Sequence, residues 1–471
     1  MTKGHTTLIA GLLAASALAA PQAAMARPAS DAAALAARLD RLESEVAALK
    51  SDLASAHAET AAATARADAA DARASAAVQQ VAAIEARPAP APAAPAEGMR
   101  SGNTTIKLGG YIKLLAGTTR FAEGEVASNS LGRDFYLPQS IPTGTGPASR
   151  TTDFTAKQSR FWLNLGSDVA GHAVKGYVEA DFQTSPGTQG SQRTTNGYNL
   201  ALRRAYVQVD RWTFGQDWTT FQYVAALPET TDYVGGAEGT VFVRQPQIRY
   251  SAPLSKTLTL HLAAENPESG TATAGSATLI ENGKDHLPDF TARLAYGGAR
   301  GELSLAGIGR QVRSESAGIG ATTAGYGASA AGKLYLNAAK TGDLRMMVTY
   351  GRNIGRYVGL NFAPDAVYVP SANRLEGATV FAAIAALRVP VGPGLRVNVM
   401  GSYQSVDYAD VLTLAQIGSF NQRAWSGAAN LFYSPVKNVD LGIEYRHGER
   451  KLVSGAQGGT DRIEFAAKYS F

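Results

Sequence analysis

The sequence predicts an all-β protein, a transmembrane antiparallel β-barrel of about 16 strands, preceded by an α-helical coiled coil. Three observations favour this fold. From residue 106 onward, short segments alternate apolar and polar residues, with turn residues between them. The connections between these segments are alternately short and long. After residue 26, no apolar run is long enough to cross a bilayer as a helix.

The N-terminus indicates export. The chain has no Cys among its 471 residues, so thiol chemistry is excluded and gives no information on the compartment. Lys3 and His5 precede the apolar stretch LIAGLLAASALAA, and Ala24 and Ala26 fit a signal-peptidase site. We therefore interpret residues 1–26 as a cleaved secretory signal peptide.

A heptad pattern follows. From Leu35 the apolar residues step by four and three in turn, which is typical of helices that associate through a coiled coil. Residues 27–86 are therefore predicted to be an oligomerisation segment. The seam does not separate a dimer from a trimer, and an Ala-rich disordered spacer is the alternative. The seam residues with the largest side chains are Leu35, Leu39, Leu42, Val46, Leu49 and Leu53.

Repeated Pro ends this segment. The stretch RPAPAPAAPAEG, which begins at Arg87, cannot continue a helix and favours an extended, semi-rigid chain. Residues 87–102 are thus predicted to be a linker, and residues 103–471 the barrel domain.

The chain ends on DRIEFAAKYSF, which alternates to its last residue. Phe465 and Tyr469 fall on one face, whereas Arg462 and Glu464 fall on the other. We expect this strand to close the barrel against the first strand, so that no edge stays unpaired. The aromatic end, Tyr469 and Phe471, resembles the signal that the outer-membrane barrel assembly machinery recognises.

The connection lengths give the orientation. A soluble sandwich has no reason to lengthen every second loop, whereas a transmembrane barrel has short periplasmic turns and long outer loops. An even number of strands then places both termini, and with them the coiled coil, in the periplasm. Long connections are expected at 120–153, 184–197, 219–242, 266–288, 311–330, 352–377, 406–422 and 448–460.

The alternating faces indicate a polar lumen. In VKGYVEADF, the side chains of Lys175, Tyr177, Glu179 and Asp181 share the face opposite the apolar one. A lumen lined in this way must hold water.

Several stretches resemble the DcaP-like family of trimeric outer-membrane porins. The resemblance implies a homotrimer with a periplasmic coiled coil and a sixteen-stranded barrel in the outer membrane of a Gram-negative bacterium. It also implies a water-filled diffusion channel for small hydrophilic solutes that favours anions such as dicarboxylates. The stretches are DFTAKQSRFWLNL (153–165), NGYNLALRRAYVQVD (196–210), FGQDWTTF (214–221), PETTDYVGG (228–236) and RQPQIRYS (244–251).

In related porins the third long loop folds inward and narrows the pore. Here that loop is 219–242, with Glu229 and Asp232 as its acidic groups. Basic residues of the early strands are expected opposite it, where fixed positive charge would concentrate anions. The residues predicted to set selectivity are Arg204, Arg249, Arg203, Arg244, Arg160, Lys175, Glu229 and Asp232.

Arg204 and Arg249 are the strongest of these candidates. They share a strand face with Gln208 and Gln247, opposite an apolar face. Guanidinium groups hold carboxylates well because their donors match both oxygens. The alternative is that these arginines pair with loop carboxylates to keep the loop folded, or contact lipopolysaccharide phosphate at the membrane edge.

Other classes of function find less support. The sequence has no Gly-x-Ser-x-Gly elbow and no metal ligands at recognisable spacing, so we expect neither an enzyme nor a cofactor or metal. Basic residues are interspersed with carboxylates, which argues against nucleic-acid binding. A structural barrel that links the membrane to peptidoglycan through the coil, with little transport, is the alternative function. Lipid and lipopolysaccharide are the expected surroundings.

Overall fold

The computed structural model describes residues 38–65 and 98–471, except 42, 49, 56, 63, 129, 184–196 and 317–318. The chain separates into two compact units, Met1–Ala96 and Glu97–Phe471. Among the described residues, no helix has the length and apolar character needed to cross a membrane.

In the first unit, the described part of residues 38–65 is helical. Its apolar residues Leu39, Val46 and Leu53 recur every seven positions and are all well exposed on the single chain. The coiled coil itself stays a prediction. The expected signal peptide and the linker up to residue 97 lie outside the described residues. Three positions of the heptad seam also lie outside them: Leu35, Leu42 and Leu49.

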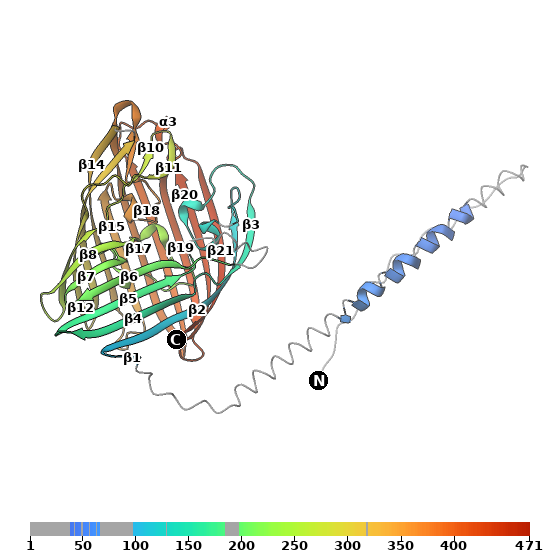
Figure 1. Ribbon diagram of the computed structural model, residues 1–471. Helices are drawn as coiled ribbons and strands as arrows, with labels where there is room; N and C mark the ends of the chain where they lie inside the picture. The colour runs from blue at the N-terminus through green and yellow to red at the C-terminus, as the bar shows by residue number, and fades with distance from the viewer. Residues whose placement is uncertain are drawn as a thin grey trace, which may run out of the picture. The chain divides into compact units, whose positions relative to one another are not determined.

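The second unit is a closed antiparallel barrel of sixteen strands (Figure 1). β3 and β4 form one interrupted wall strand, because β3 pairs with the end of β2 and β4 with its beginning. The wall strands are β2 (Thr104–Phe121), β3 (Ser149–Thr155), β4 (Arg160–Val169), β5 (His172–Asp181), β6 (Ala201–Val209), β7 (Trp212–Trp218), β8 (Arg244–Pro253), β9 (Leu258–Glu265), β12 (Asp289–Gly298), β13 (Gly301–Ser316), β14 (Ile319–Tyr335), β15 (Asp343–Arg352), β17 (Arg374–Gly392), β18 (Leu395–Tyr408), β19 (Asn421–Tyr433), β20 (Val439–Leu452) and β21 (Gln457–Ser470).

The remaining described elements are not wall strands of this ring. β1 pairs with the start of β2, β10 and β11 form a hairpin, and β16 pairs with both β10 and β17. They are β1 (Met99–Ser101), β10 (Gly270–Thr273), β11 (Ser276–Glu281), β16 (Ala366–Val369), α2 (Leu131–Asp134), α3 (Leu414–Ile417), η1 (Pro138–Ser140), η2 (Val224–Ala226), η3 (Ala237–Gly239), η4 (Gly355–Tyr357) and η5 (Pro370–Ala372). The expected linker, 87–102, therefore ends in a short strand.

The last strand closes the barrel, as the sequence predicts. β21 pairs with β2 from Thr460 to Ser470. The Phe471 N–H then donates to the Gly110 carbonyl at 3.0 Å, and the Gly110 N–H donates to the Phe471 carbonyl at 3.2 Å. The alternation also holds, since Phe465 is 42% exposed and Glu464 only 2%. No edge of this sheet is left open between its first and last wall strands.

Two of the expected long loops are strands. β13 and β14 pair without interruption from Gly301 to Ser316, through the expected loop 311–330. Likewise, β20 continues to Leu452 and β21 begins at Gln457, so most of the expected loop 448–460 consists of strand. Both stretches are rich in Gly, Ala, Ser and Thr, which resemble loop residues in sequence but fit a long hairpin equally well.

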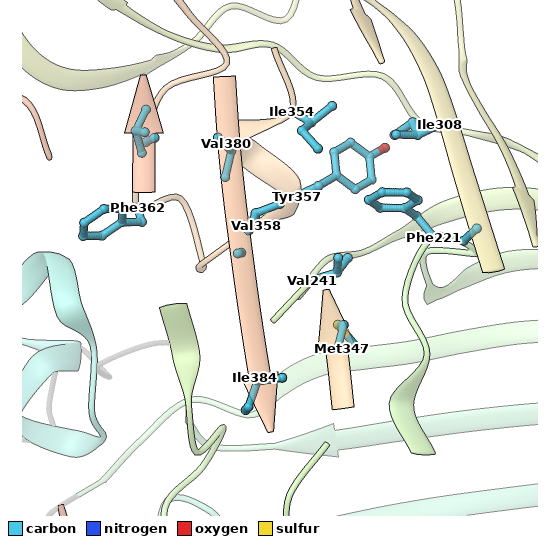
Figure 2. Packing of buried hydrophobic residues seen from close by; sticks show 14 of the residues in the cluster. Phe221, Val241, Ile308, Met347, Ile354, Tyr357, Val358, Phe362, Val380 and Ile384 are labelled. Atoms are coloured by element: carbon cyan, nitrogen blue, oxygen red, sulfur yellow. The ribbon is translucent and has the colours of Figure 1, made fainter. Parts of the chain in front are cut away.

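Part of the barrel interior is apolar, which corrects the expectation of a polar lumen throughout. On β17 the buried residues Val380 and Ile384 alternate with outward-facing Phe381, so they point inward. Two loops cover them from inside. Figure 2 shows the ring of Tyr357 between Ile354 and Phe221, and the ring centroids of Tyr357 and Phe221 lie 6.1 Å apart. The Tyr357 hydroxyl at the edge of this cluster donates to Asp289 at 2.7 Å.

Candidate functional site

The loop between β7 and β8, residues 219–243, lies inside the barrel and is called loop 3 below. Its residue Glu229 is held by the late strands. Arg396 of β18 donates to its carboxylate at 2.7 Å, and Arg388 of β17 lies 3.5 Å away. Asn398 adds a hydrogen bond at 3.3 Å. These bonds fasten the middle of loop 3 to the wall.

The next residues of loop 3 are fastened just as firmly. The Thr231 N–H donates to Glu444 of β20 at 3.1 Å, and the Thr231 hydroxyl donates to Glu464 of β21 at 3.2 Å. Lys113 of β2 donates to the Thr231 carbonyl at 2.6 Å. Asp232 accepts the Tyr136 N–H at 3.3 Å. Loop 3 is therefore pinned by three neighbouring wall strands and by the first long loop.

Burial sets the protonation of the loop 3 acids. The pKa of Asp232 is raised to about 7, because burial and the nearby carboxylate of Glu464 both disfavour its charged form. Burial also raises the pKa of Glu238, which is fully buried. Burial opposes ionisation of Glu229 too, but the hydrogen bonds from Arg396 outweigh it and lower its pKa.

Glycines let loop 3 lie close to the wall. Gly235 has φ +89°, a conformation that other residues rarely adopt. A Cβ on Gly236 would lie 2.6 Å from the Cβ of Ser402, and one on Gly239 would lie 2.3 Å from the Ala383 carbonyl oxygen. Any larger residue would push the loop away from β17 and β18.

Opposite the pinned acids stands a group of arginines from β4, β6 and β8, here called the arginine wall. Arg203 and Arg204 are neighbours, yet both side chains turn inward because β6 contains a bulge. Glu179 pairs with Arg204 and Ala180 with Leu202, so Arg203 is the extra residue. The wall consists of Arg160, Arg203, Arg204, Arg244 and Arg249.

Two wall arginines share a pair of carboxylates on β5. Arg203 is only 3% exposed and lies 2.6 Å from Glu179 and 2.7 Å from Asp181. Arg160 lies 3.1 Å from the same oxygen of Asp181. The charges of these two guanidiniums are thus neutralised by Glu179 and Asp181. Arg203 is best described as a structural residue that holds the wall together, and not as a solute-binding residue.

Two further arginines share a single carboxylate. Arg204 Nε lies 2.6 Å from Oδ1 of Asp217, and Arg249 Nη2 lies 2.8 Å from its Oδ2. This Arg204–Asp217–Arg249 triad keeps one positive charge in excess. Both arginines also keep part of their surface exposed, at 22% and 15% of the side chain.

Arg244 and Lys175 have no carboxylate partner among the described residues. The Arg244 guanidinium lies over the rings of Trp218 and Phe242, at 5.2 and 5.9 Å. Its Nη1 is buried without a hydrogen-bond partner. Lys175 lies nearer the short-turn end of β5 and is exposed.

Sequence reasoning missed Arg293 of β12. It donates from Nη1 to the Gln222 carbonyl of loop 3 at 2.5 Å, and its Nε has no partner. Its guanidinium lies 5.8 Å from the Tyr223 ring centroid. Its position on a strand with alternating character, DFTARLAY, could have suggested an inward side chain.

Loop 3 meets the arginine wall through an aromatic residue and not through its acids, which corrects the expected arrangement. The Tyr233 ring lies 5.3 Å from the Arg203 guanidinium and 5.8 Å from that of Arg160. Its hydroxyl donates to Asp181 at 3.1 Å. Glu229 is instead held by the late strands and Asp232 by the Tyr136 N–H of the first long loop, so neither carboxylate is paired with the early arginines.

Within the described residues, no group of three or more His, Cys, Asp or Glu is placed to hold a metal ion.

A closed sixteen-stranded barrel with an inward loop and a charged interior defines a porin-type β-barrel of the outer membrane. Residues 98–471 match the family model described as DcaP outer membrane protein, so the chain belongs to this family. A comparison with curated proteins gave no match.

Three solved structures are similar to this chain to different degrees. The outer membrane channel DcaP of Acinetobacter baumannii is 26% identical, with a TM-score of 0.64, over 79% of this chain and 99% of that one. OmpT of Vibrio cholerae is 10% identical over 80% and 100% of the two chains, with a TM-score of 0.49. An anion-selective porin from Comamonas acidovorans is 11% identical over 78% and 100%, with a TM-score of 0.45.

Proposed function

We propose that the protein is a diffusion channel for small hydrophilic solutes that favours anions, with small carboxylates as the preferred class. The observation that carries this proposal is the charge of the arginine wall. Its five guanidiniums face three carboxylates, those of Glu179, Asp181 and Asp217. The excess is positive, and in a narrow lumen with low-dielectric walls it raises the local concentration of anions.

The position of loop 3 supports the same function. Glu229 is held against the late strands and Asp232 accepts the Tyr136 N–H, so these two acids do not cancel the wall arginines. The apolar cluster occupies the interior beside β13 to β17, so solutes are expected to pass along the side that carries the arginines. This arrangement narrows the water-filled path and brings solutes close to the exposed parts of Arg204 and Arg249.

A structural barrel with little transport is the second candidate. It is favoured by the apolar packing of loop 3 and residues 353–363 inside the barrel, which occupies space that a wide pore would need. In that case the helical segment, acting on peptidoglycan, would be the working part of the protein.

The remaining assignments belong to the same proposal. Residues 1–26 are removed on export, residues 27–86 form a periplasmic trimeric coil, and residues 87–102 link it to the barrel. The exposed heptad residues Leu39, Val46 and Leu53 support self-association, because a lone helix would leave them in water. Deleting residues 27–98 is expected to weaken the trimer, and an equally stable trimer would argue against this role.

A planar lipid bilayer tests the function. The mature protein is expected to give stepwise conductance in potassium chloride, in groups of three if the trimer is right. A lasting absence of conductance from correctly folded protein would overturn the channel and favour the structural barrel.

A further inference from the structure

We propose that the lumen contains a second anion-binding site, between the arginine wall and the short-turn end of the barrel, which takes flat organic carboxylates. The inference rests on the proposed channel function and adds a binding step to it. The site is a cavity of about 390 Å³, here called the lysine pocket. The residues that carry the argument are Lys107, Asn164, Lys175, Tyr177, Tyr206 and Gln208.

Strand register places these residues on one inward face. Across neighbouring strands, Lys107 pairs with Asn164, Asn164 with Tyr177, and Tyr177 with Tyr206. One step nearer the turns, Lys175 pairs with Gln208. Tyr177 lies two residues from Glu179 on the same strand, so both side chains point to the same face. Because the buried Glu179 contacts the arginine wall, these paired residues all face the lumen.

A glycine makes the hollow. Gly166 pairs with Thr105 on one side and with Lys175 on the other. A Cβ added to Gly166 would meet nothing within 4 Å. The space between Lys107 and Lys175 is therefore not filled by the wall itself.

The two lysines are free to bind. Neither Lys107 nor Lys175 forms an ion pair or hydrogen bond with any other described residue, in contrast to most arginines of the wall above them. An ammonium group is a compact charge that pairs with a carboxylate without a fixed approach angle. Two ammonium groups beside an empty hollow, with the Asn164 amide as a further donor, make a site for an anion. The Gln208 amide already donates to the Asp210 carbonyl at 2.9 Å.

Aromatic rings give the site its preference for flat ligands. The rings of Tyr177 and Tyr206 stack with centroids 5.4 Å apart and an angle of 27°. The guanidinium of Arg204 lies 4.6 Å from the first ring and 5.5 Å from the second. The tyrosines thus connect the triad with the lysine pocket, and a planar apolar body gains contact area on them. A carboxylate leaving the triad would meet the lysines next.

Benzoate and acetate test the pocket, because each carries one carboxylate and only benzoate has a ring. Single channels in a bilayer are titrated with each anion in potassium chloride, and the concentration that halves the current is measured. Benzoate is expected to block at a lower concentration than acetate. Lys107→Gln with Lys175→Gln is expected to raise the benzoate value about fivefold, since each exposed charge pair contributes up to about 1 kcal/mol.

The matched control is Lys256→Gln with Lys437→Gln, which removes the same charge from exposed turns at the same end of the barrel. It is expected to leave the benzoate block unchanged. The proposal would be overturned if benzoate and acetate halved the current at the same concentration. It would also be overturned if the half-blocking concentration of benzoate were unchanged in the Lys107 and Lys175 variant. Failure of the channel itself is distinguishable, because chloride current or its anion preference would then be missing before any benzoate is added.

Discussion

Arg204 of β6 and Arg249 of β8 bind the two oxygens of one carboxylate, that of Asp217, at 2.6 and 2.8 Å. A carboxylate held from both sides cannot turn toward a passing solute, and it balances only one of the two positive charges. Arg204 also lies 3.8 Å from Glu179, but Arg160 and Arg203 already share that carboxylate. The pair therefore acts as a fixed positive charge in the lumen.

Replacing both arginines with alanine is expected to lower anion preference. The triad would change from one positive charge to one negative charge, because Asp217 loses both partners. The zero-current potential under a tenfold potassium chloride gradient should move toward the potential of a channel that passes only potassium ions. Asp217→Asn, which makes the triad more positive, should move it the opposite way.

The control for this pair is Arg211→Ala with Arg300→Ala, which removes two arginines from short turns. It should leave the potential almost unchanged, because exposed charges at the mouth are screened by salt. If the Arg204 and Arg249 variant behaves like this control, the triad does not set selectivity.

Glu229→Gln is expected to loosen loop 3. The change removes the charge that Arg396 and Arg388 hold, and it leaves both guanidiniums without this carboxylate. A loss of about 1–3 kcal/mol in the free energy of unfolding is typical for such groups. Denaturant titration in detergent and open-channel current noise would measure it. Glu281→Gln, on the exposed strand β11, is the control, and a variant as stable and quiet as that control would contradict the pin.

Docking of loop 3 is expected to depend on pH through Asp232. Its pKa is raised to about 7 when docked, by burial and by the carboxylates of Glu464 and Glu444, and returns to about 4 when the loop leaves the wall. The protonated form therefore favours docking. The contribution of Asp232 to docking is largest below pH 4, weakens as pH rises to 7 and changes little above that.

Current noise recorded between pH 4 and 8 would follow this change. Asp232→Asn mimics the protonated group and still accepts a hydrogen bond, so most of the pH dependence should disappear, with a remainder from Glu238. Retention of the full pH dependence in the variant would show that another group is responsible.

Removing Phe471 is expected to reduce the amount of folded protein in the outer membrane. Its backbone makes the last two hydrogen bonds of the seam with Gly110, and its side chain is the expected assembly signal. Phe471→Ala keeps the backbone bonds, so comparing the two variants separates seam closure from recognition. Normal assembly of both would contradict each role.

The sequence predicts the barrel well because its signal is local. Alternation along DRIEFAAKYSF and the Gly-rich turns depend only on neighbouring residues, and the structure follows them. The stretch VFAAIAAL in β17 is apolar on both faces, so alternation is lost where an inner loop covers the wall. The strand that binds each acid of loop 3 is also determined by contacts far apart in the sequence. Glu229, for example, accepts hydrogen bonds from Arg396, which lies 167 positions later. The bulge that turns Arg203 inward also depends on pairing with the neighbouring strand. In the sequence it appears only as two consecutive arginines, Arg203 and Arg204.

The most direct measurement is the zero-current potential of the unmodified protein in a planar bilayer under a potassium chloride gradient. The account predicts stepwise conductance and a potential whose sign shows that chloride passes more easily than potassium. A potential of the opposite sign from well-folded channels would contradict it, because the arginine wall would then not control the ions that pass.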